Sequence, residues 1–175
     1  LKSPALVRVF AAFAKSGTEI RVVGGAARNA LLHQPISDID LATPARPELV
    51  TDIATKAGLA VHPTGIEHGT VTIVADGVAF EVTTLRRDVE TDGRRAVVAF
   101  TDDWREDAMR RDFTINAIYV APDGTIFDPA GGLEDLKIAH VRFIGDASDR
   151  IREDYLRILR FFRFTAEYAE HDPDA

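Results

Sequence analysis

The spacing of apolar residues divides the chain into short helices and short strands. Leu6, Phe10 and Phe13 recur at helical intervals, and comparable spacing returns several times along the first two thirds of the sequence. Helices are predicted over residues 4–15, 26–34, 48–59 and 104–111. Runs rich in β-branched and aromatic residues predict strands over residues 19–23, 37–43, 114–120 and 125–128.

Two further alternating runs predict a β-hairpin. Residues 69–76 and 78–85 flank Asp76-Gly77, a dipeptide that strongly favours a tight hairpin turn. Residues 86–98 carry many charges of both signs, which predicts an exposed, mobile loop. From Ser148 the pattern is that of one long helix that would end at Pro173.

This order of elements indicates the α+β class. Strands mixed with helices and an obvious hairpin favour a mixed, largely antiparallel sheet flanked by helices over a doubly wound parallel sheet. We expect a first domain over residues 1–145 and the start of an all-helical region over residues 146–175. Because the sequence begins without methionine and stops soon after the last helix, we expect a piece of a longer protein.

Composition narrows the possible functions. Hydrophobic residues make up 46% of the 175 residues, which is enough for a well-filled core, and no cysteine is present for a disulfide or a thiolate metal site. The formal charge of −7 argues against RNA binding by electrostatics alone, so RNA contacts are expected to be local or to lie outside this segment. We expect a soluble cytoplasmic protein without a membrane span or a targeting signal.

Asp38 and Asp40 stand out in the predicted strand over residues 37–43. Side chains alternate along a strand, so the two carboxylates would share one face, about 6–7 Å apart along the backbone. Two carboxylates that are close together repel each other, and a divalent cation such as Mg²⁺ would offset this repulsion. A half-exposed edge strand with solvated acids is the alternative.

Three neighbouring features bear on the same site. Gly24-Gly25 lies between a strand and a helix start, where backbone N–H groups can bind phosphate, although it could also be only a tight turn. Arg28 adds a guanidinium that can take phosphate oxygens. Glu81 falls inside an apolar run and is either a third acid of the site or a residue on the solvent face of the hairpin.

Six motifs in the same order carry a resemblance to a known family. The chain resembles the bacterial class II tRNA nucleotidyltransferase and poly(A) polymerase family, within the polymerase-β-like nucleotidyltransferase superfamily, over about residues 20–165. The motifs are VVGGAARNALL, SDIDLAT, FEVTTLR, RRDFTINAIYV, FDPAGGLEDL and REDYLRILRFFRF. Asn29 departs from the pattern, because many members carry an acid there.

The resemblance implies a nucleotidyltransferase head followed by a helical neck. It implies that Asp38 and Asp40 bind two Mg²⁺ ions, with Mn²⁺ as a possible substitute, and that Glu81 is a third carboxylate of the catalytic site. The substrates implied are CTP, ATP and the 3′ end of tRNA, and most of the tRNA contacts are expected from C-terminal domains outside this chain. Nucleotide-binding roles are implied for Gly24, Gly25, Arg28, Arg111, Asp112, Asn116, Asp154, Arg157 and Arg160.

Two of these roles have a clear chemical basis. Arg111 would contact the triphosphate, and Asp112 and Asn116 the ribose hydroxyls, whereas the plainer alternative is a salt bridge from Arg110 or Arg111 to Glu106 or Asp107. Asp154 and Arg157 lie one helical turn apart in the pattern, and a carboxylate and a guanidinium match the edges of C and A but not those of U and G.

The last predicted helix would be amphipathic. Its charged face would hold the proposed base-reading pair, and its opposite face would be apolar. The residues of the predicted apolar stripe are Ile151, Tyr155, Leu159, Phe162 and Ala166.

Other functions remain open from the sequence. A poly(A) polymerase or an A-adding enzyme of the same family shares the catalytic motifs, and a catalytically degenerate nucleotide- or RNA-binding module would retain the fold. The glycines of FDPAGGLEDL predict a tight bend that acts as a hinge rather than a catalytic element. His62, His68 and His140 show no zinc-ligand spacing.

Overall fold

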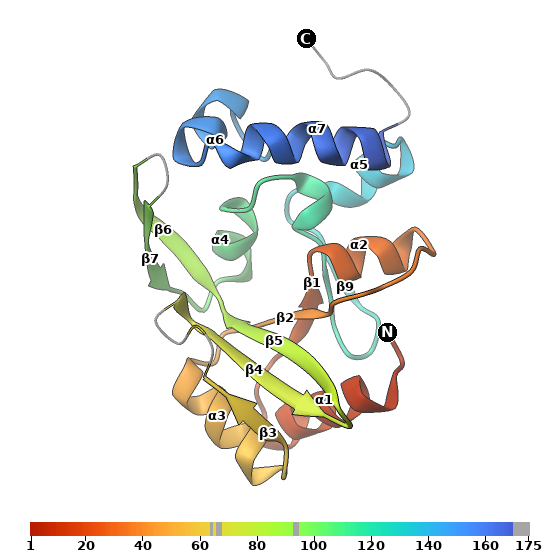
Figure 1. The fold of residues 1–175 in the computed structure, drawn as a ribbon, viewed down its shortest axis with the longest axis vertical. Coiled ribbons are helices and arrows are strands. Elements are labelled where there is room, and N and C mark those ends of the chain that lie inside the picture. Colours follow the sequence, from red (N-terminus) through yellow and green to blue (C-terminus); the bar gives the residue numbers. More distant parts are fainter. Residues whose placement is uncertain (64, 66–67, 93–94, 170–175) are drawn as a thin grey trace.

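A seven-stranded sheet forms the centre of the molecule (Figure 1). This computed structural model describes residues 1–63, 65, 68–92 and 95–169, with the side chains of residues 89–98 left out. The strand order is β3-β4-β5-β2-β1-β8-β9; β2 and β5 run parallel, and the other neighbouring pairs are antiparallel. The predicted mixed, largely antiparallel sheet is confirmed. The strands are β1 (Arg21–Val23), β2 (Asp40–Thr43), β3 (Ala60–His62), β4 (Thr70–Ala75), β5 (Val78–Thr84), β8 (Tyr119–Val120) and β9 (Ile126–Phe127).

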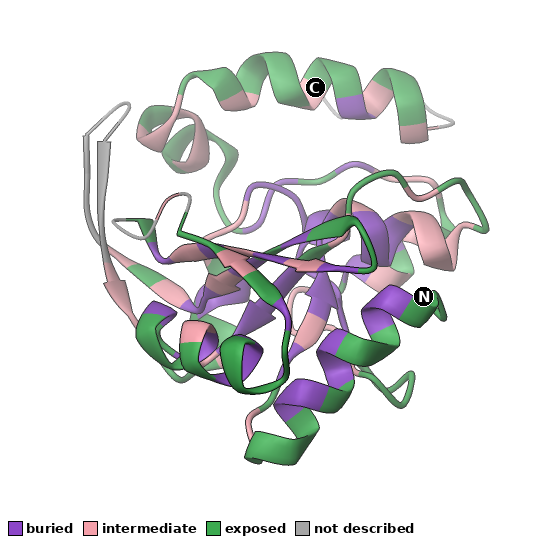
Figure 2. Ribbon diagram, turned by 60° about the horizontal axis from the view of Figure 1, so that its bottom comes forward, coloured by how far each residue is buried: buried purple, intermediate pink, exposed green. Residues whose placement is uncertain are grey.

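Two N-terminal helices cover one face of this sheet. Helices α1 (Pro4–Ser16) and α3 (Pro47–Lys56) pack against each other and against β4 (Figure 1). Leu6 and Phe13 of α1 are fully buried against Ile73 of β4 and Phe80 of β5, and the outward side of α1 is exposed (Figure 2). The amphipathic pattern therefore predicted both helices correctly. The remaining helices are α2 (Gly25–Leu31), α4 (Trp104–Met109), η2 (Thr114–Asn116), α5 (Gly132–Lys137), α6 (Ala147–Glu153) and α7 (Leu156–Tyr168).

The predicted hairpin over residues 69–85 is confirmed as β4 and β5. Ala75 pairs with Val78, and the two residues between them, Asp76 and Gly77, have φ angles of 51° and 78°. Positive φ at both central residues is the geometry of a type I′ turn, which Asp-Gly favours. The short β3 was not predicted, because its three residues are half-exposed or exposed and carry little apolar pattern.

The loop predicted over residues 86–98 is wrong for the described backbone. β6 (Arg86–Asp92) and β7 (Arg95–Phe100) pair antiparallel as a separate two-stranded sheet, with Arg86 opposite Phe100. Ladder hydrogen bonds come from the backbone and are compatible with any side-chain charge, so the density of charged residues was a misleading signal. The prediction for Gly93 and Arg94 lies outside the described residues.

The strand predicted over residues 114–120 is correct only at its end. Thr114–Asn116 forms the 3₁₀ helix η2, and β8 begins at Tyr119. The Thr114 amide donates to the carbonyl of Arg142, and its hydroxyl donates to the buried carboxylate of Asp135. These contacts with a distant segment hold the backbone out of the sheet, which a local pattern could not reveal.

Helix α5 starts where the sequence predicted a bend. The carboxylate of Asp128 accepts from the amides of Gly132 and Leu133, and Gly131 has a left-handed φ of 77°. A Cβ at Gly132 would lie 2.2 Å from the carbonyl oxygen of Thr114, so only glycine fits there. The hinge role stays a prediction.

This close approach gives a stability prediction. Gly132→Ala is expected to reduce the free energy of unfolding by about 2–3 kcal/mol, because the added methyl group must push the η2 backbone away. Glu134→Ala in the same helix changes an exposed side chain and is expected to stay within about 0.5 kcal/mol. Urea unfolding of the two variants measures the difference. Equal free energies of unfolding would show that the η2 backbone can move to accommodate the methyl group without loss of stability.

The single long helix predicted from Ser148 is wrong, because the chain forms two helices. Helix α6 ends at Glu153, Asp154 is extended at φ −155°, and α7 begins at Leu156 (Figure 1). The Asp154 carboxylate accepts from the Leu156 amide, which is the contact of a helix cap. No helix within the described ranges is both long and apolar enough to cross a bilayer.

Most of the apolar stripe predicted for this segment is exposed, and only Ile151 of its residues packs against the aromatic cluster around Phe113 within the described chain. Tyr155, Leu159 and Phe162 are 61%, 68% and 61% exposed, and most of α7 is exposed in Figure 2. The face of α7 that packs on the preceding part of the chain presents Phe161 and Phe164 to an aromatic cluster with Phe113 and Phe143. Helical spacing identifies an apolar face of α7, but it does not show which of its apolar residues pack against the rest of the chain.

Candidate active site

Acidic side chains lie side by side at the β2–β5 pair. Asp40 is the first residue of β2 and is directly opposite Glu81 of β5 in the parallel register. Partners in register point to the same face, and the next pair, Leu41 and Val82, is fully buried on the other face. Asp40 and Glu81 therefore share the face that looks away from the core.

The electrostatics at Asp40 reflect this crowding. Partial burial raises the pKa of Asp40 above its ordinary value, and the Glu81 and Asp38 carboxylates raise it further, against an opposing effect of Arg111. Within the described residues its carboxylate makes no hydrogen bond or ion pair with another side chain. Asp40 thus presents negative charge that the protein itself does not neutralise by direct contact.

Asp38 does not lie in the strand that the sequence predicted. β2 begins at Asp40, so Asp38 precedes it in a segment without regular structure, and the argument from alternating faces fails for this residue. In the part of the chain that the structure describes, no three aspartate, glutamate or histidine side chains form a group that could hold a metal ion. The expected cluster of three carboxylates is therefore not formed, whereas Asp38 and Asp40 remain close enough to influence each other. Paired oxygen donors with uncompensated charge fit a hard divalent cation.

Gly24 opens the space beside Asp40. Its φ of 70° and ψ of −136° belong to a region that side chains other than glycine rarely adopt. A Cβ at this position would lie 3.9 Å from both Nη1 of Arg111 and Oδ2 of Asp40. Gly24, Asp40 and Arg111 therefore meet at one place, next to Gly25 at the start of α2.

Arg111 is held there by a triangle of hydrogen bonds. Its Nε donates to the hydroxyl of Tyr119 at 3.1 Å, and its Nη2 donates to Oδ2 of Asp107 at 3.0 Å. The Tyr119 hydroxyl in turn donates to the same Asp107 oxygen at 2.7 Å. The predicted alternative, a salt bridge between Arg111 and Asp107, is thus present, and it leaves Nη1 directed at Gly24 and Asp40.

Both members of the Arg111–Asp107 pair are stabilised as ions. Burial alone would raise the pKa of Asp107, but Arg111 and hydrogen bonds from Tyr119 and the Arg86 amide outweigh it, and the net pKa is lowered. Burial would lower the pKa of Arg111, but the contacts with Tyr119 and Asp107 raise it. Burial also raises the pKa of Tyr119, which stays a neutral donor.

Arg28 points inward rather than toward a ligand. Its nitrogens donate to the side-chain oxygens of Asn29 and Asn116 and, at 2.7 Å, to the hydroxyl of Tyr168, whose ring lies 4.1 Å from the guanidinium. The residue is 6% exposed, and burial lowers its pKa. A phosphate would have to displace these partners, so the structure does not favour the phosphate contact predicted for Arg28.

Asp112 and Asn116 belong to the same buried network. Asn116 Nδ2 donates to Oδ1 of Asp112 at 3.2 Å, and Oδ2 of Asp112 accepts from Nε and Nη2 of Arg160 at 2.7 and 2.6 Å. Asp112 also accepts from the Phe113 amide. The structure brings Arg28, Asn116, Asp112 and Arg160 together, but their polar atoms are largely satisfied by one another.

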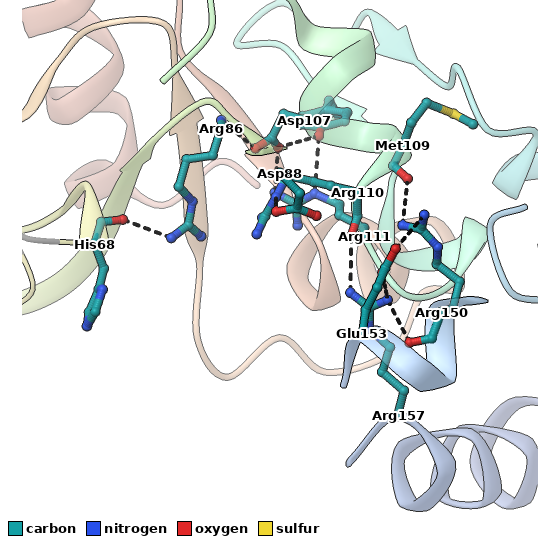
Figure 3. A network of polar contacts seen from close by, with 11 residues as sticks. His68, Arg86, Asp88, Asp107, Met109, Arg110, Arg111, Arg150, Glu153 and Arg157 are labelled. Carbon is teal, nitrogen blue, oxygen red and sulfur yellow. Dashed lines mark hydrogen bonds and ion pairs between the residues drawn. The ribbon is translucent and has the colours of Figure 1, made fainter. Parts of the chain in front are cut away.

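The predicted base-reading pair lies at the break between α6 and α7. Arg157 Nη1 donates to Glu153 at 2.6 Å and to the Arg150 carbonyl, and Nη2 donates to the Arg110 carbonyl (Figure 3). Asp154 lies just before α7, where its carbonyl accepts from the Arg157 amide at 3.0 Å, so the two residues are one turn apart at the start of the helix; their base-reading role stays a prediction. Glu153, which also pairs with Arg150 at 2.8 Å, was missed as a partner of Arg157.

Two partners lay beyond the reach of sequence reasoning. Tyr119 contacts Arg111 only because β8 follows a 3₁₀ turn, and Tyr168 reaches Arg28 from the far end of α7. Asp107 had a usable signal, because it stands four residues before Arg111 with helical spacing.

Comparison with known proteins agrees with this architecture. The chain is 48% identical over 174 residues to the mitochondrial CCA tRNA nucleotidyltransferase 1 of Danio rerio, which covers 97% of this chain and 40% of that relative. It is 46% identical over 154 residues to the CCA-adding enzyme of Leuconostoc citreum, covering 87% of this chain and 37% of that one. The chain therefore spans about two fifths of the length of these relatives.

A solved structure and a family model agree with the comparisons to these two relatives. The crystal structure of Bacillus stearothermophilus CCA-adding enzyme in complex with CTP superposes with a TM-score of 0.84 at 38% identity, covering 95% of this chain and 41% of that chain. The family model of the poly A polymerase head domain matches residues 20–142, which is well over half of the sequence. The resemblance seen in the six motifs is confirmed, and the chain belongs to the poly A polymerase head domain family.

Proposed function

We propose that the full-length protein adds C and A residues to the 3′ end of tRNA from CTP and ATP and releases pyrophosphate. The observation that carries this proposal is the meeting of Asp40, Gly24 and Arg111 beside the central strand β2, with Glu81 next to Asp40 on the same face of the sheet. A negative group for cations, a glycine that permits close approach and a directed guanidinium are what a nucleoside triphosphate requires.

Divalent cations are part of this proposal. The family is one of metal-dependent nucleotidyltransferases, and we propose Mg²⁺ as the metal, with Mn²⁺ as a substitute, held by Asp38 and Asp40. When bound, such ions supply charge stabilisation for the attacking and the leaving oxygens of an in-line phosphoryl displacement. Glu81, in register with Asp40 on the same face of the sheet, would act as a third carboxylate that orients this acidic site.

The chain's own residues would position the nucleotide. Arg111 Nη1 donates toward the place that the triphosphate would take, and Gly24 leaves room there because it has no side chain. Asp112 and Asn116 are proposed to reach the ribose hydroxyls, and Arg160 to hold Asp112 for this contact. Asp154 and Arg157 are proposed to read the base edge.

The test uses the full-length protein and a tRNA that lacks its terminal CCA. Each nucleotide is offered alone and then CTP with ATP, and the products are sequenced. Addition of two C residues with CTP alone, followed by one A when ATP is present, is the expected result. Incorporation of other nucleotides, or none, would contradict the proposal.

A second enzymatic candidate is a poly(A) polymerase or an A-adding enzyme. The matching family model describes the head domain of poly A polymerase, which supports this alternative. In the same assay it would extend the RNA with ATP alone and ignore CTP. A catalytically degenerate binding module would bind nucleotide without incorporating it.

Arg157→Ala provides a test of base selection. The Arg157 guanidinium is proposed to donate a hydrogen bond to a ring acceptor of C or A, and U and G carry an N–H at that position instead. Without the guanidinium, the preference for CTP and ATP over UTP and GTP is expected to fall by about tenfold to a hundredfold. Ratios of kcat/KM for the four nucleotides measure this change. Arg152→Ala, which alters an exposed arginine of α6, serves as the control and is expected to keep the ratios. Unchanged ratios in Arg157→Ala would remove the base-reading role.

We also propose that residues 1–145 form the catalytic head and that residues 146–175 begin a helical neck. The uncovered apolar side chains Tyr155, Leu159 and Phe162, and a groove of about 440 Å³ between α6, α7 and residues 140–145, are features that further helices would cover. A cytoplasmic location stays a prediction, which fractionation of the source cells would test, since vertebrate relatives are described as mitochondrial.

A further inference from the structure

We propose that Asp107 and Tyr119 are positioning residues that aim the Arg111 guanidinium at the triphosphate of the incoming nucleotide. The inference rests on the proposed function, since it names what orients one of its phosphate contacts. Neither residue is expected to touch the nucleotide. Asp107 is 2% exposed and Tyr119 fully buried, so both act on the ligand only through Arg111.

The geometry leaves Arg111 one orientation. An arginine has several rotatable bonds and adopts many conformations unless its nitrogens are bound. Here Nε and Nη2, two of the three nitrogens, donate to Tyr119 and Asp107, and the plane of the guanidinium is fixed by these two contacts. The third nitrogen, Nη1, then lies beside Gly24 and Asp40, where the proposed triphosphate would be bound.

The two positioning residues are themselves rigidly held. The ring of Tyr119 packs edge-on against Trp104 at 5.4 Å and tilted against Phe127 at 6.1 Å. The second oxygen of Asp107 accepts from the backbone amide of Arg86 at 3.0 Å (Figure 3). Segments from α4, β6 and β8 therefore converge on the guanidinium, and a donor that is oriented before the ligand arrives loses less entropy on binding.

A carboxylate beside a phosphate-binding arginine is unexpected if charge alone matters. Asp107 cancels most of the positive charge of Arg111, which weakens the long-range attraction for a triphosphate. The two explanations therefore predict opposite results for Asp107→Asn. Loss of the negative charge should strengthen triphosphate binding if charge dominates, and should weaken it if orientation dominates.

The main experiment is a double-mutant cycle in the full-length protein with Tyr119→Phe and Arg111→Lys. Tyr119→Phe keeps the packed ring and removes only the hydroxyl, and Arg111→Lys keeps the charge but cannot make the forked contacts. Binding of CTP and of CMP to each variant is measured by calorimetry with Mg²⁺ present. Thermal unfolding of each variant is followed alongside.

Tyr119→Phe is expected to weaken CTP binding about fivefold to twentyfold with Arg111 present and less than twofold in the Arg111→Lys background. CMP binding should change less than twofold throughout, because CMP lacks the two outer phosphates. Asp107→Asn should weaken CTP binding as well. In steady-state assays of Tyr119→Phe, KM for CTP should rise while kcat stays within twofold.

Several outcomes would overturn the inference. Equal losses in both Arg111 backgrounds, equal losses for CTP and CMP, or tighter CTP binding by Asp107→Asn would each show that Asp107 and Tyr119 do not aim Arg111. The proposed function fails separately: a wild-type protein that binds CTP but incorporates no nucleotide refutes polymerisation, while the binding cycle still decides the positioning role.

Discussion

Replacement of Asp40 by asparagine is expected to lower nucleotide incorporation by the full-length protein on the order of a thousandfold or more. The substitution preserves size and removes one negative charge from the acidic face where Glu81 also lies and which the Asp38 carboxylate influences. If this face binds the cations that stabilise the transition state, several kcal/mol of stabilisation are lost, and each 1.4 kcal/mol corresponds to a factor of about ten in rate. Single-turnover incorporation of labelled CTP measures the effect.

The fold is expected to survive this change. Within the described residues the Asp40 carboxylate makes no hydrogen bond or ion pair, so no structural contact is lost, and the thermal midpoint should stay within about 2 °C. Asp52→Asn is the matched control, because it removes a carboxylate from the surface of α3 that pairs with exposed Lys56. Full activity of Asp40→Asn would refute the catalytic assignment of this face.

Asp107→Ala is expected to have the largest effect on stability, a loss of about 3–5 kcal/mol in the free energy of unfolding. The substitution leaves the partly buried Arg111 guanidinium and the buried Tyr119 hydroxyl without their shared partner, and removing one member of such a charge pair is costly. Urea unfolding at neutral pH measures the loss. The exposed pair of Lys56 and Asp52 provides the comparison, since Asp52→Ala should cost less than about 1 kcal/mol.

The same substitution should alter the dependence of stability on pH. The pKa of Asp107 is lowered in the folded state, so its contribution is fully present above the ordinary aspartate value of about 4 and is lost as pH falls through the lower folded value. The difference in stability between wild type and Asp107→Ala should therefore shrink on acidification below about pH 4. A difference that stays constant down to the lowest pH would mean that Asp107 does not titrate with folding.

Local chemistry explains which parts of the fold could be predicted. The Asp76-Gly77 turn depends on the φ angles of two adjacent residues, and α1 depends on one apolar face, so both could be read from short windows. The β6–β7 pair and the break at Asp154 depend on backbone pairing and on a cap, for which the side-chain pattern carries no clear signal. The pattern of side chains therefore predicted the turn and α1 but missed the β6–β7 pair and the break at Asp154.

The candidate site shows the same division. Asp40 was identified by the Asp-x-Asp pattern and Arg111 through the family resemblance of its motif, and the structure brings them together at Gly24. Asp38 was placed on the strand because the alternation of apolar residues continues past the point where pairing stops. Arg28 was assigned to phosphate because it follows Gly24-Gly25 by one helical turn, whereas its partners are the adjacent Asn29 and two residues from distant segments, Asn116 and Tyr168.

The contact between Arg28 and Tyr168 spans 140 positions of the sequence. During synthesis, at roughly 5–20 residues per second, α2 would leave the ribosome on the order of ten seconds before the last turn of α7 exists. Until then Arg28 must remain hydrated or find temporary partners. The nascent chain therefore cannot complete this part of its interior until α7 has emerged, and a ribosome stalled before Tyr168 would expose a nascent chain in which the aromatic cover of Arg28 is missing.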